Sequence, residues 1–200
     1  MVKNILIAGV GGQGTLLSSR ILGNVALDLG YDVKLSEVHG MAQRGGSVVT
    51  HVRYGEKVYS PVIDLGRADI IIAFEELEAI RALPYLKKDG RIFVNSRRIM
   101  PLPVLSGAAA YPEDIHDRIR QRVKDAVFTD ALSLAESAGN KRTLNTVMLG
   151  VAARSTGFER EHFITALKQT VKPALLEVNL KAFDLGLDQS TKHKAQSTNN

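Results

Sequence analysis

The stretch ILIAGVGGQG at residues 5–14 decides the fold class, because a short β-branched run leads directly into a glycine loop of the form G-x-G-x-x-G. The run is apolar throughout, which predicts a strand buried on both faces of a parallel sheet. After Gly14, apolar residues recur at helical spacing as far as Leu29, and Gly30 stands where a helix would end. Residues 32–38 supply a second strand. Strand, loop, helix and strand together have the length of one βαβ unit and predict an α/β fold.

The rest of the chain continues this alternation and then becomes helical. We predict a β-hairpin over residues 48–59, with its turn at Gly55-Glu56. Residues 96–111 show little periodicity and are expected to form a loop. Apolar runs predict further strands at residues 69–74, 91–95 and 127–129. Helical spacing predicts helices at residues 75–86, 112–123, 131–138, 144–155, 161–171 and 173–185.

These elements predict a Rossmann-like, mostly parallel sheet with an inserted β-hairpin and a helical C-terminal region. We expect a single domain over residues 1–186. Residues 187–200 are polar and lack an apolar anchor, so we expect a disordered tail there.

Composition restricts the chemistry that this chain can perform by itself. Its 200 residues are 44% hydrophobic and 24% charged, which is typical of one globular domain. Zero cysteine excludes iron–sulfur ligation, thiolate zinc sites, disulfides and a cysteine nucleophile. The sequence shows neither a secretory signal nor an apolar run long enough for a membrane span, so we expect a cytoplasmic protein with no membrane partner. The net charge of +5 is spread along the chain and carries no nucleic-acid-binding motif, so we expect no nucleic-acid partner.

The glycine loop is the first candidate site. Glycines at a strand-to-helix turn let the backbone approach a phosphate, and the N-terminus of the helix attracts anions. A Walker A loop is excluded, because Thr15 rather than lysine follows Gly14. The alternative is a tight strand-to-helix crossing that binds no ligand.

The second candidate site is the polar, glycine-containing stretch that follows the second strand, at residues 37–47. Glu37 stands about where a dinucleotide-binding fold keeps its ribose-binding acid. Arg44 can clamp a phosphate or carboxylate, and His39 is a weak candidate for proton transfer. The alternative is an ordered connection in which these side chains bind only the protein itself. For the remaining polar candidates, structural roles such as helix capping are favoured: Glu75, Glu76, Asp130, Asn140, Asn145 and His51.

Three segments together resemble one protein family. They are GVGGQG at residues 9–14, SEVHGMAQRGGSV at residues 36–48, and the stretch from Asp130 through GNKRTLNTVMLG at residues 139–150. The chain resembles the γ-type subunit of thiamine-dependent 2-oxoacid:ferredoxin oxidoreductases, and within that family it is most similar to the β subunit of indolepyruvate ferredoxin oxidoreductase. The family's motif residues fall on Gly9, Gly11, Gly12, Gln13 and Gly14 in the first loop and on Glu37, His39, Gln43, Arg44, Gly45 and Gly46 in the second.

The resemblance implies a subunit of a larger enzyme. The complex would decarboxylate an arylpyruvate oxidatively, forming an acyl-coenzyme A, carbon dioxide and reduced ferredoxin. The large partner subunit would hold thiamine diphosphate, magnesium and [4Fe–4S] clusters, while this chain would bind no cofactor alone and would be inactive in isolation. Arg44 would contact coenzyme A or the oxoacid, and the glycine loop would shape the subunit junction. A chain that buries one face against a partner is also expected to self-associate when alone.

Two other functions remain as alternatives. A self-sufficient NAD(P)-dependent oxidoreductase would use the glycine loop and Glu37. A basic nucleic-acid-binding module would bind with an affinity that falls steeply with added salt.

Overall fold

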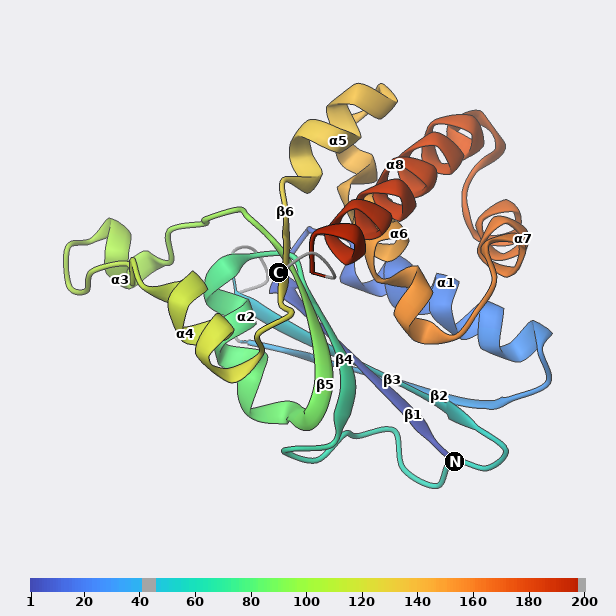
Figure 1. The fold of residues 1–200 in the computed structure, drawn as a ribbon, viewed down its shortest axis with the longest axis horizontal. Coiled ribbons are helices and arrows are strands. Elements are labelled where there is room, and N and C mark those ends of the chain that lie inside the picture. Colours follow the sequence, from blue (N-terminus) through green and yellow to red (C-terminus); the bar gives the residue numbers. More distant parts are fainter. Residues whose placement is uncertain (41–45, 198–200) are drawn as a thin grey trace.

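The computed structural model describes residues 1–40 and 46–197, with side chains as far as residue 190. At its centre is a six-stranded sheet with the strand order β2-β3-β1-β4-β5-β6 (Figure 1). The strands are β1 (Lys3–Val10), β2 (Asp32–His39), β3 (Ser47–Gly55), β4 (Ala68–Ala73), β5 (Leu86–Asn95) and β6 (Val127–Thr129). The pairs β1–β4, β4–β5 and β5–β6 are parallel, whereas β3 is antiparallel to both β1 and β2. The predicted α/β fold with a mostly parallel sheet is confirmed.

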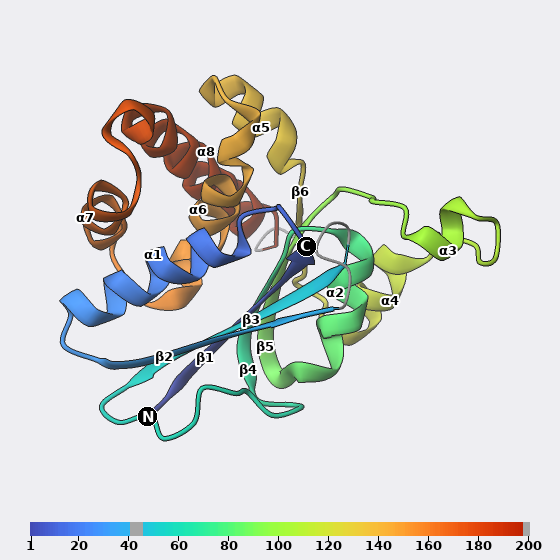
Figure 2. The ribbon, with the colours of Figure 1, turned by 180° about the vertical axis from the view of Figure 1, so that it is seen from behind.

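Helices cover both faces of the sheet (Figures 1 and 2). One face is packed by α1 (Thr15–Asp28), α5 (Ala131–Ala138), α6 (Leu144–Thr156), α7 (Arg160–Thr170) and α8 (Pro173–Ser197). The other face is packed by α2 (Glu76–Ala82) and α4 (Ile115–Arg122). Three short helices complete the fold: η1 (Leu83–Tyr85), η2 (Lys141–Thr143) and α3 (Leu102–Leu105).

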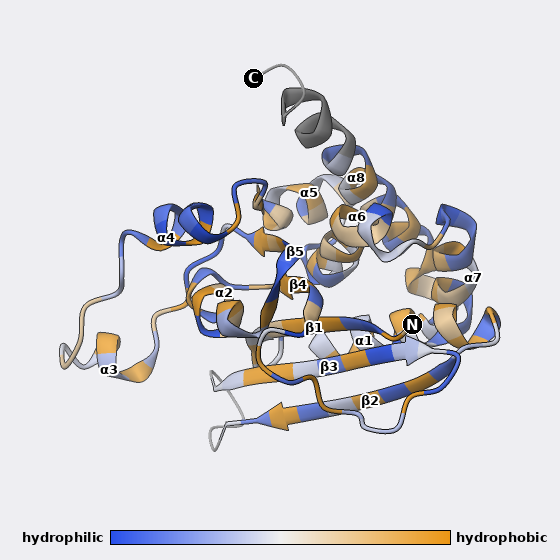
Figure 3. Cartoon of the chain, turned by 60° about the horizontal axis from the view of Figure 1, so that its bottom comes forward, coloured by the Kyte–Doolittle hydropathy of each residue, from blue (hydrophilic) through white to orange (hydrophobic). Residues whose placement is uncertain are grey.

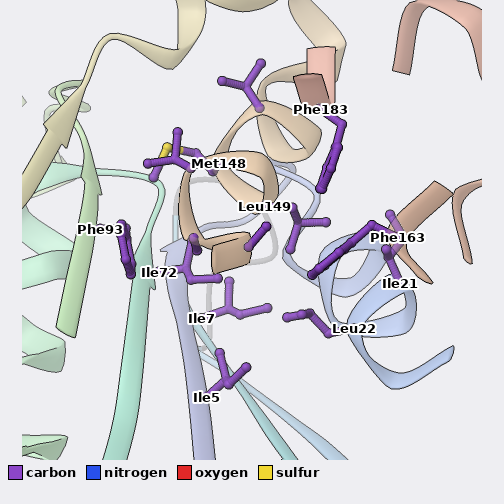
Figure 4. Packing of buried hydrophobic residues seen from close by; sticks show 14 of the residues in the cluster. Ile5, Ile7, Ile21, Leu22, Ile72, Phe93, Met148, Leu149, Phe163 and Phe183 are labelled. Atoms are coloured by element: carbon purple, nitrogen blue, oxygen red, sulfur yellow. The ribbon is translucent and has the colours of Figure 1, made fainter. Parts of the chain in front are cut away.

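Side-chain alternation along β1 divides the core into two layers. Ile5 and Ile7 belong to the layer with α1 and α6, whereas Leu6 and Ala8 belong to the layer with α2 and α4. None of these side chains is more than 1% exposed. Figure 4 shows Ile5 and Ile7 among the side chains of the larger layer. Burial on both faces explains why this strand is apolar throughout.

Helices α6 and α8 approach each other closely because glycines face the crossing. A Cβ added to Gly150 would lie 2.2 Å from the carbonyl oxygen of Phe183, and one added to Gly186 would lie 2.1 Å from that of Val147. Both contacts are with backbone atoms, which cannot rotate away. The pair of glycines therefore fixes the distance between α6 and α8.

The predicted hairpin over residues 48–59 is wrong in its pairing. β3 instead forms a hairpin with β2, and its other edge pairs with β1, so no edge is left for a strand after Gly55. The segment that follows is held by tertiary contacts. Val58 N donates to Asp32 Oδ2 at 2.9 Å, and Ile63 N donates to His51 Nδ1 at 3.2 Å. β2 runs parallel to β1 but is separated from it by β3, so these two strands do not form an adjacent βαβ pair.

The later elements agree more closely with their predictions, and two segments differ. β6 and α5 have the predicted bounds. Helix α8 continues to Ser197, over most of the stretch expected to be disordered from residue 187, because a helix already formed extends at little further cost. Residues 198–200 lie outside the described part. The expected loop over residues 96–111 contains the short helix α3. Helix α4, which follows it in the chain, is largely hydrophilic (Figure 3).

Candidate functional site

The glycine loop joins β1 to α1, and the Gln13 side chain holds its shape. Gln13 Oε1 accepts a hydrogen bond from Val10 N at 2.6 Å, and Gln13 Nε2 donates to the Phe74 carbonyl at 3.0 Å. Gly9 leaves room for this amide, because a Cβ there would lie 2.8 Å from Gln13 Oε1. Both polar atoms of the Gln13 amide therefore bind backbone groups, at Val10 and at Phe74, and so fix the shape of the loop.

Helix α1 begins without a capping side chain. Gly12 and Gly14 have φ values of 94° and 85°, in the left-handed region that glycine adopts without strain. Gly14 is the N-cap, and the first turn of α1 contains no acidic residue. The N-terminal N–H groups and the helix dipole therefore give this end of α1 a positive potential.

A pocket of about 660 Å³ lies beside this loop, within the usual size range of small-molecule sites. One side consists of residues 11–14 and Leu17, and the opposite side comes from α5, η2 and the start of α6. Arg97 and Ile99 complete the lining from the segment after β5. The pocket thus lies at the carboxyl ends of β1 and β5, the edge at which α/β sheets bind ligands.

Three exposed basic side chains line this pocket: Arg97, Lys141 and Arg142. Within residues 1–40 and 46–190, none of the three makes a side-chain hydrogen bond or an ion pair. The Arg97 backbone is fixed, because its carbonyl accepts from Glu76 N at 3.0 Å and its N–H donates to the Asn95 carbonyl at 2.7 Å. Glu136 is the one acidic residue that lines the described pocket. The pocket is therefore positively charged at neutral pH.

Asn145 places a buried donor at the same pocket. The residue is 3% exposed, and its Nδ2 has no hydrogen-bond partner in the described structure. It packs against the glycine loop, since a Cβ on Gly14 would lie 3.1 Å from Asn145 Nδ2. A buried donor without a partner costs about 1–3 kcal/mol. The predicted capping role is wrong for this residue, because the preceding η2 turn places the N-cap of α6 at Thr143.

The described residues of the second predicted loop lie against the glycine loop. Gly11 N donates to the Gly46 carbonyl at 3.0 Å. Glu37 Oε2 accepts from the hydroxyls of Thr15 at 3.1 Å and Thr50 at 2.9 Å, and Glu37 Oε1 lies 2.9 Å from His39 Nε2. Glu37 therefore binds its own fold and is not among the pocket-lining residues. The other predicted residues of this loop, Gln43, Arg44 and Gly45, lie outside the described residues.

The acidic residues after β4 have the structural role expected of them. Glu75 caps α2 by accepting from Glu78 N at 2.9 Å, and it also accepts from the Tyr111 hydroxyl at 2.6 Å. Burial and this carboxylate raise the pKa of Tyr111. Glu76 binds Arg98 at 2.7 Å and His116 at 2.8 Å. These contacts fix the segment between β5 and α4, residues 96–114, which contains α3.

The other structural expectations are confirmed. Asp130 caps α5 by accepting from Ser133 N at 3.1 Å, and Asn140 caps η2 by accepting from Arg142 N at 3.0 Å. His51 is buried within the sheet, and desolvation lowers its pKa from the ordinary 6.5.

Sequence reasoning missed the three basic residues of the pocket. Arg97 follows a strand that the sequence does predict, but nothing local distinguishes it from Arg98. Lys141 and Arg142 stand inside the GNKRTLNTV stretch, which offered the one available signal.

In the part of the chain that the structure describes, no three His, Asp or Glu side chains gather as metal ligands. None of the described helices combines the length and the hydropathy that a membrane span requires.

Comparisons with known proteins show the family to which this chain belongs. The family model "Pyruvate ferredoxin/flavodoxin oxidoreductase" matches residues 4–189. The indolepyruvate oxidoreductase subunit IorB of Pyrococcus horikoshii is 44% identical, over 92% of this chain and 94% of that protein. The common γ subunit of the pyruvate/ketoisovalerate oxidoreductases of Pyrococcus abyssi is 27% identical, over 87% of this chain and 89% of that protein.

A solved structure shares the fold. The γ subunit of keto/oxoacid ferredoxin oxidoreductase from Geobacter sulfurreducens superposes with a TM-score of 0.70 at 21% identity, over 95% of this chain and 99% of that one. The family model spans nearly the whole domain, and the resemblance drawn from the sequence motifs is confirmed. This chain belongs to the pyruvate ferredoxin/flavodoxin oxidoreductase family.

Proposed function

We propose that this chain is the small, non-redox subunit of a cytoplasmic thiamine-dependent 2-oxoacid:ferredoxin oxidoreductase that acts on an arylpyruvate such as indolepyruvate. The observation that carries the proposal is the 44% identity to an indolepyruvate oxidoreductase subunit along nearly all of both chains, against 27% to the pyruvate/ketoisovalerate subunit. The complex would release carbon dioxide from the oxoacid, transfer the acyl group to coenzyme A and pass two electrons to ferredoxin.

The residues of this chain fit one part of that chemistry. The sequence has no cysteine to ligate a cluster, and the described residues include no group of metal ligands. Thiamine diphosphate, its magnesium and the [4Fe–4S] clusters therefore belong to the larger partner in this proposal. The basic pocket beside the glycine loop fits the phosphates of coenzyme A instead, because phosphate groups bind helix N-termini and basic side chains.

The segment between β5 and α4, which contains α3, has the exposed apolar side chains expected of a surface that the larger subunit covers. Leu102 and Leu105 are 76% and 70% exposed, and Met100 is 41% exposed. Figure 1 shows α3 projecting away from the sheet and its helices. Clustered apolar side chains on a projecting segment are typical of a protein interface. Self-association of the isolated chain stays a prediction on the same grounds.

The structure disfavours the alternative of an NAD(P)-dependent enzyme. The carboxylate of Glu37, which would bind the ribose there, is instead bound to Thr15, Thr50 and His39. Arg44 stays a predicted contact to coenzyme A or the oxoacid. If Arg44→Ala left the affinity of the assembled complex for both molecules unchanged, that role would be refuted.

The test is co-expression without air of this chain with the large subunit from the same source. We expect a brown complex that reduces ferredoxin only when coenzyme A and an arylpyruvate are both present. The kcat/KM values for pyruvate and ketoisovalerate, measured over the same range of concentrations, should be much lower than that for the arylpyruvate. A chain that elutes alone and binds NAD(H) would refute the proposal.

A further inference from the structure

Strand β2 leaves one edge of the sheet open. It is the outermost strand, and in the part of the chain that the structure describes no strand pairs with its outer side (Figure 3). Gly40 N donates to the Ser47 carbonyl at 2.9 Å, which continues the register of β2 and β3. Because hydrogen-bonding groups alternate along a strand, even-numbered residues bind β3, whereas Val33, Leu35 and Glu37 turn their backbone N–H and C=O groups outward. This edge therefore offers a row of donors and acceptors to another strand.

Exposed apolar side chains line the same edge. Gly23 of α1 packs against β2, since a Cβ there would lie 3.3 Å from Leu35 Cδ1. Leu16 and Leu27 lie on the same stripe of α1 as Gly23, because they stand seven residues before it and four after it. Helix α1, β2 and the turn between them together carry six large apolar side chains that are at least 39% exposed: Leu16, Leu27, Leu29, Tyr31, Leu35 and Val38. The edge therefore has the apolar surface of a protein interface.

The sequence of β2 suits pairing with a second copy of itself. In a two-fold pair of antiparallel strands both copies use the same edge, so a single residue lies opposite its own copy at the centre. A pair centred on Leu35 buries that exposed side chain against its own copy. Centring the pair on Lys34 or on Glu37 would set like charges opposite each other, which destabilises a sheet. Centring it on Ser36 would set Leu35 opposite the charged Glu37.

The same two-fold axis brings the α1 helices of both copies together. Helix α1 contacts β2 and β3, and the side chains of directly opposite residues point to the same face, so both copies of α1 lie on one face. With strands about 4.8 Å apart, the two helix axes come within about 10 Å, a distance at which helices pack. The helices run antiparallel, so Leu16 of each copy approaches Leu27 of the other. Backbone pairing and apolar burial therefore favour the same arrangement.

We propose that two copies of this chain associate through the outer edge of β2, with Leu35 at the two-fold axis. The two sheets then form one continuous sheet, and the α1 helices pack across the axis. This interface does not rest on the proposed function, because it uses no property of the larger subunit. In an assembled enzyme, the contact would join two copies of the complex through their small subunits.

Sedimentation velocity of the purified full chain, over a range of concentrations, tests the association. We expect a dimer, and Leu27→Glu/Val38→Glu should raise its dissociation constant at least about tenfold, because each carboxylate would lose water at the interface. Both positions are 55% exposed, and the unfolding midpoint shows whether the variant still folds. Leu65→Glu/Leu105→Glu is the matched control, since these leucines are 66% and 70% exposed and lie outside α1 and β2. It should leave the dimer unchanged.

The absence of cysteine from the sequence lets an introduced disulfide report the register. Directly opposite residues of a hydrogen-bonded pair have Cα atoms about 5.5 Å apart, which a disulfide can span. Leu35→Cys should therefore give a cross-linked dimer under mild oxidation, whereas Leu65→Cys should remain monomeric on a denaturing gel. Cross-linking of Ser36→Cys in its place would support the edge and overturn the centre at Leu35. A chain that stays monomeric at every concentration, or a dimer that survives Leu27→Glu/Val38→Glu, would overturn the proposal.

Discussion

Replacing Gly14 by alanine tests whether the glycine loop is shaped around Asn145. The substitution places a side chain at φ 85°, which costs an L residue about 1–2 kcal/mol. The new Cβ would also lie 3.1 Å from both Cγ and Nδ2 of Asn145. Asn145 is 3% exposed and cannot swing into solvent, so we expect about 1 kcal/mol more from overpacking. The free energy of unfolding should fall by about 2–3 kcal/mol in total.

Gly30→Ala is the matched control. Gly30 has a φ of 82°, and a Cβ there meets nothing within 4 Å, so only the backbone strain of about 1–2 kcal/mol applies. Urea unfolding of both variants gives the difference, and calorimetry with pyrophosphate shows whether binding weakens in Gly14→Ala alone. Equal losses of stability, or unchanged binding to Gly14→Ala, would refute the reasoning.

Two further predictions concern the core and the pH dependence of stability. Gly186→Ala should lower the free energy of unfolding by about 3 kcal/mol or more, because its Cβ would lie 2.1 Å from the Val147 carbonyl oxygen. Lys181→Ala, on the exposed side of α8, should change the free energy of unfolding by under about 0.5 kcal/mol, and thermal denaturation compares the two variants. Burial lowers the pKa of His51 from 6.5, so the unfolded chain binds its proton at a higher pH than the folded one, and stability should fall as the pH drops below 6.5. Urea titrations should show a shallower fall in His51→Gln than in the unchanged chain, and identical slopes would contradict this role of His51.

The strands and helices that the sequence predicts well are those whose pattern is local. β1 reads as a buried parallel strand because both of its faces are covered, and β6 and α5 end where short apolar runs meet capping residues. The hairpin was misplaced for the opposite reason. The alternation around Gly55 is compatible with pairing on either side, and only the complete sheet shows that β1 and β2 already occupy both edges of β3.

The candidate site divides in the same way. The glycine loop is readable because strand, glycines and helix are adjacent in sequence, and the loop motifs are enough to indicate the family. Glu37 fits the expected spacing, but its contacts with Thr15 and Thr50 come from tertiary packing.

By itself, then, the sequence determined the α/β class, the family and the position of the glycine loop, since these depend on residues close together in the chain. The pocket beside that loop depends on residues 11–14, 97 and 141–145, which are brought together by the order of the strands and by the packing of α6 on the sheet. Only the tertiary structure decided that a buried amide and three basic side chains face one space. No sequence period links positions so far apart, because the distance between them is set by how the layers pack.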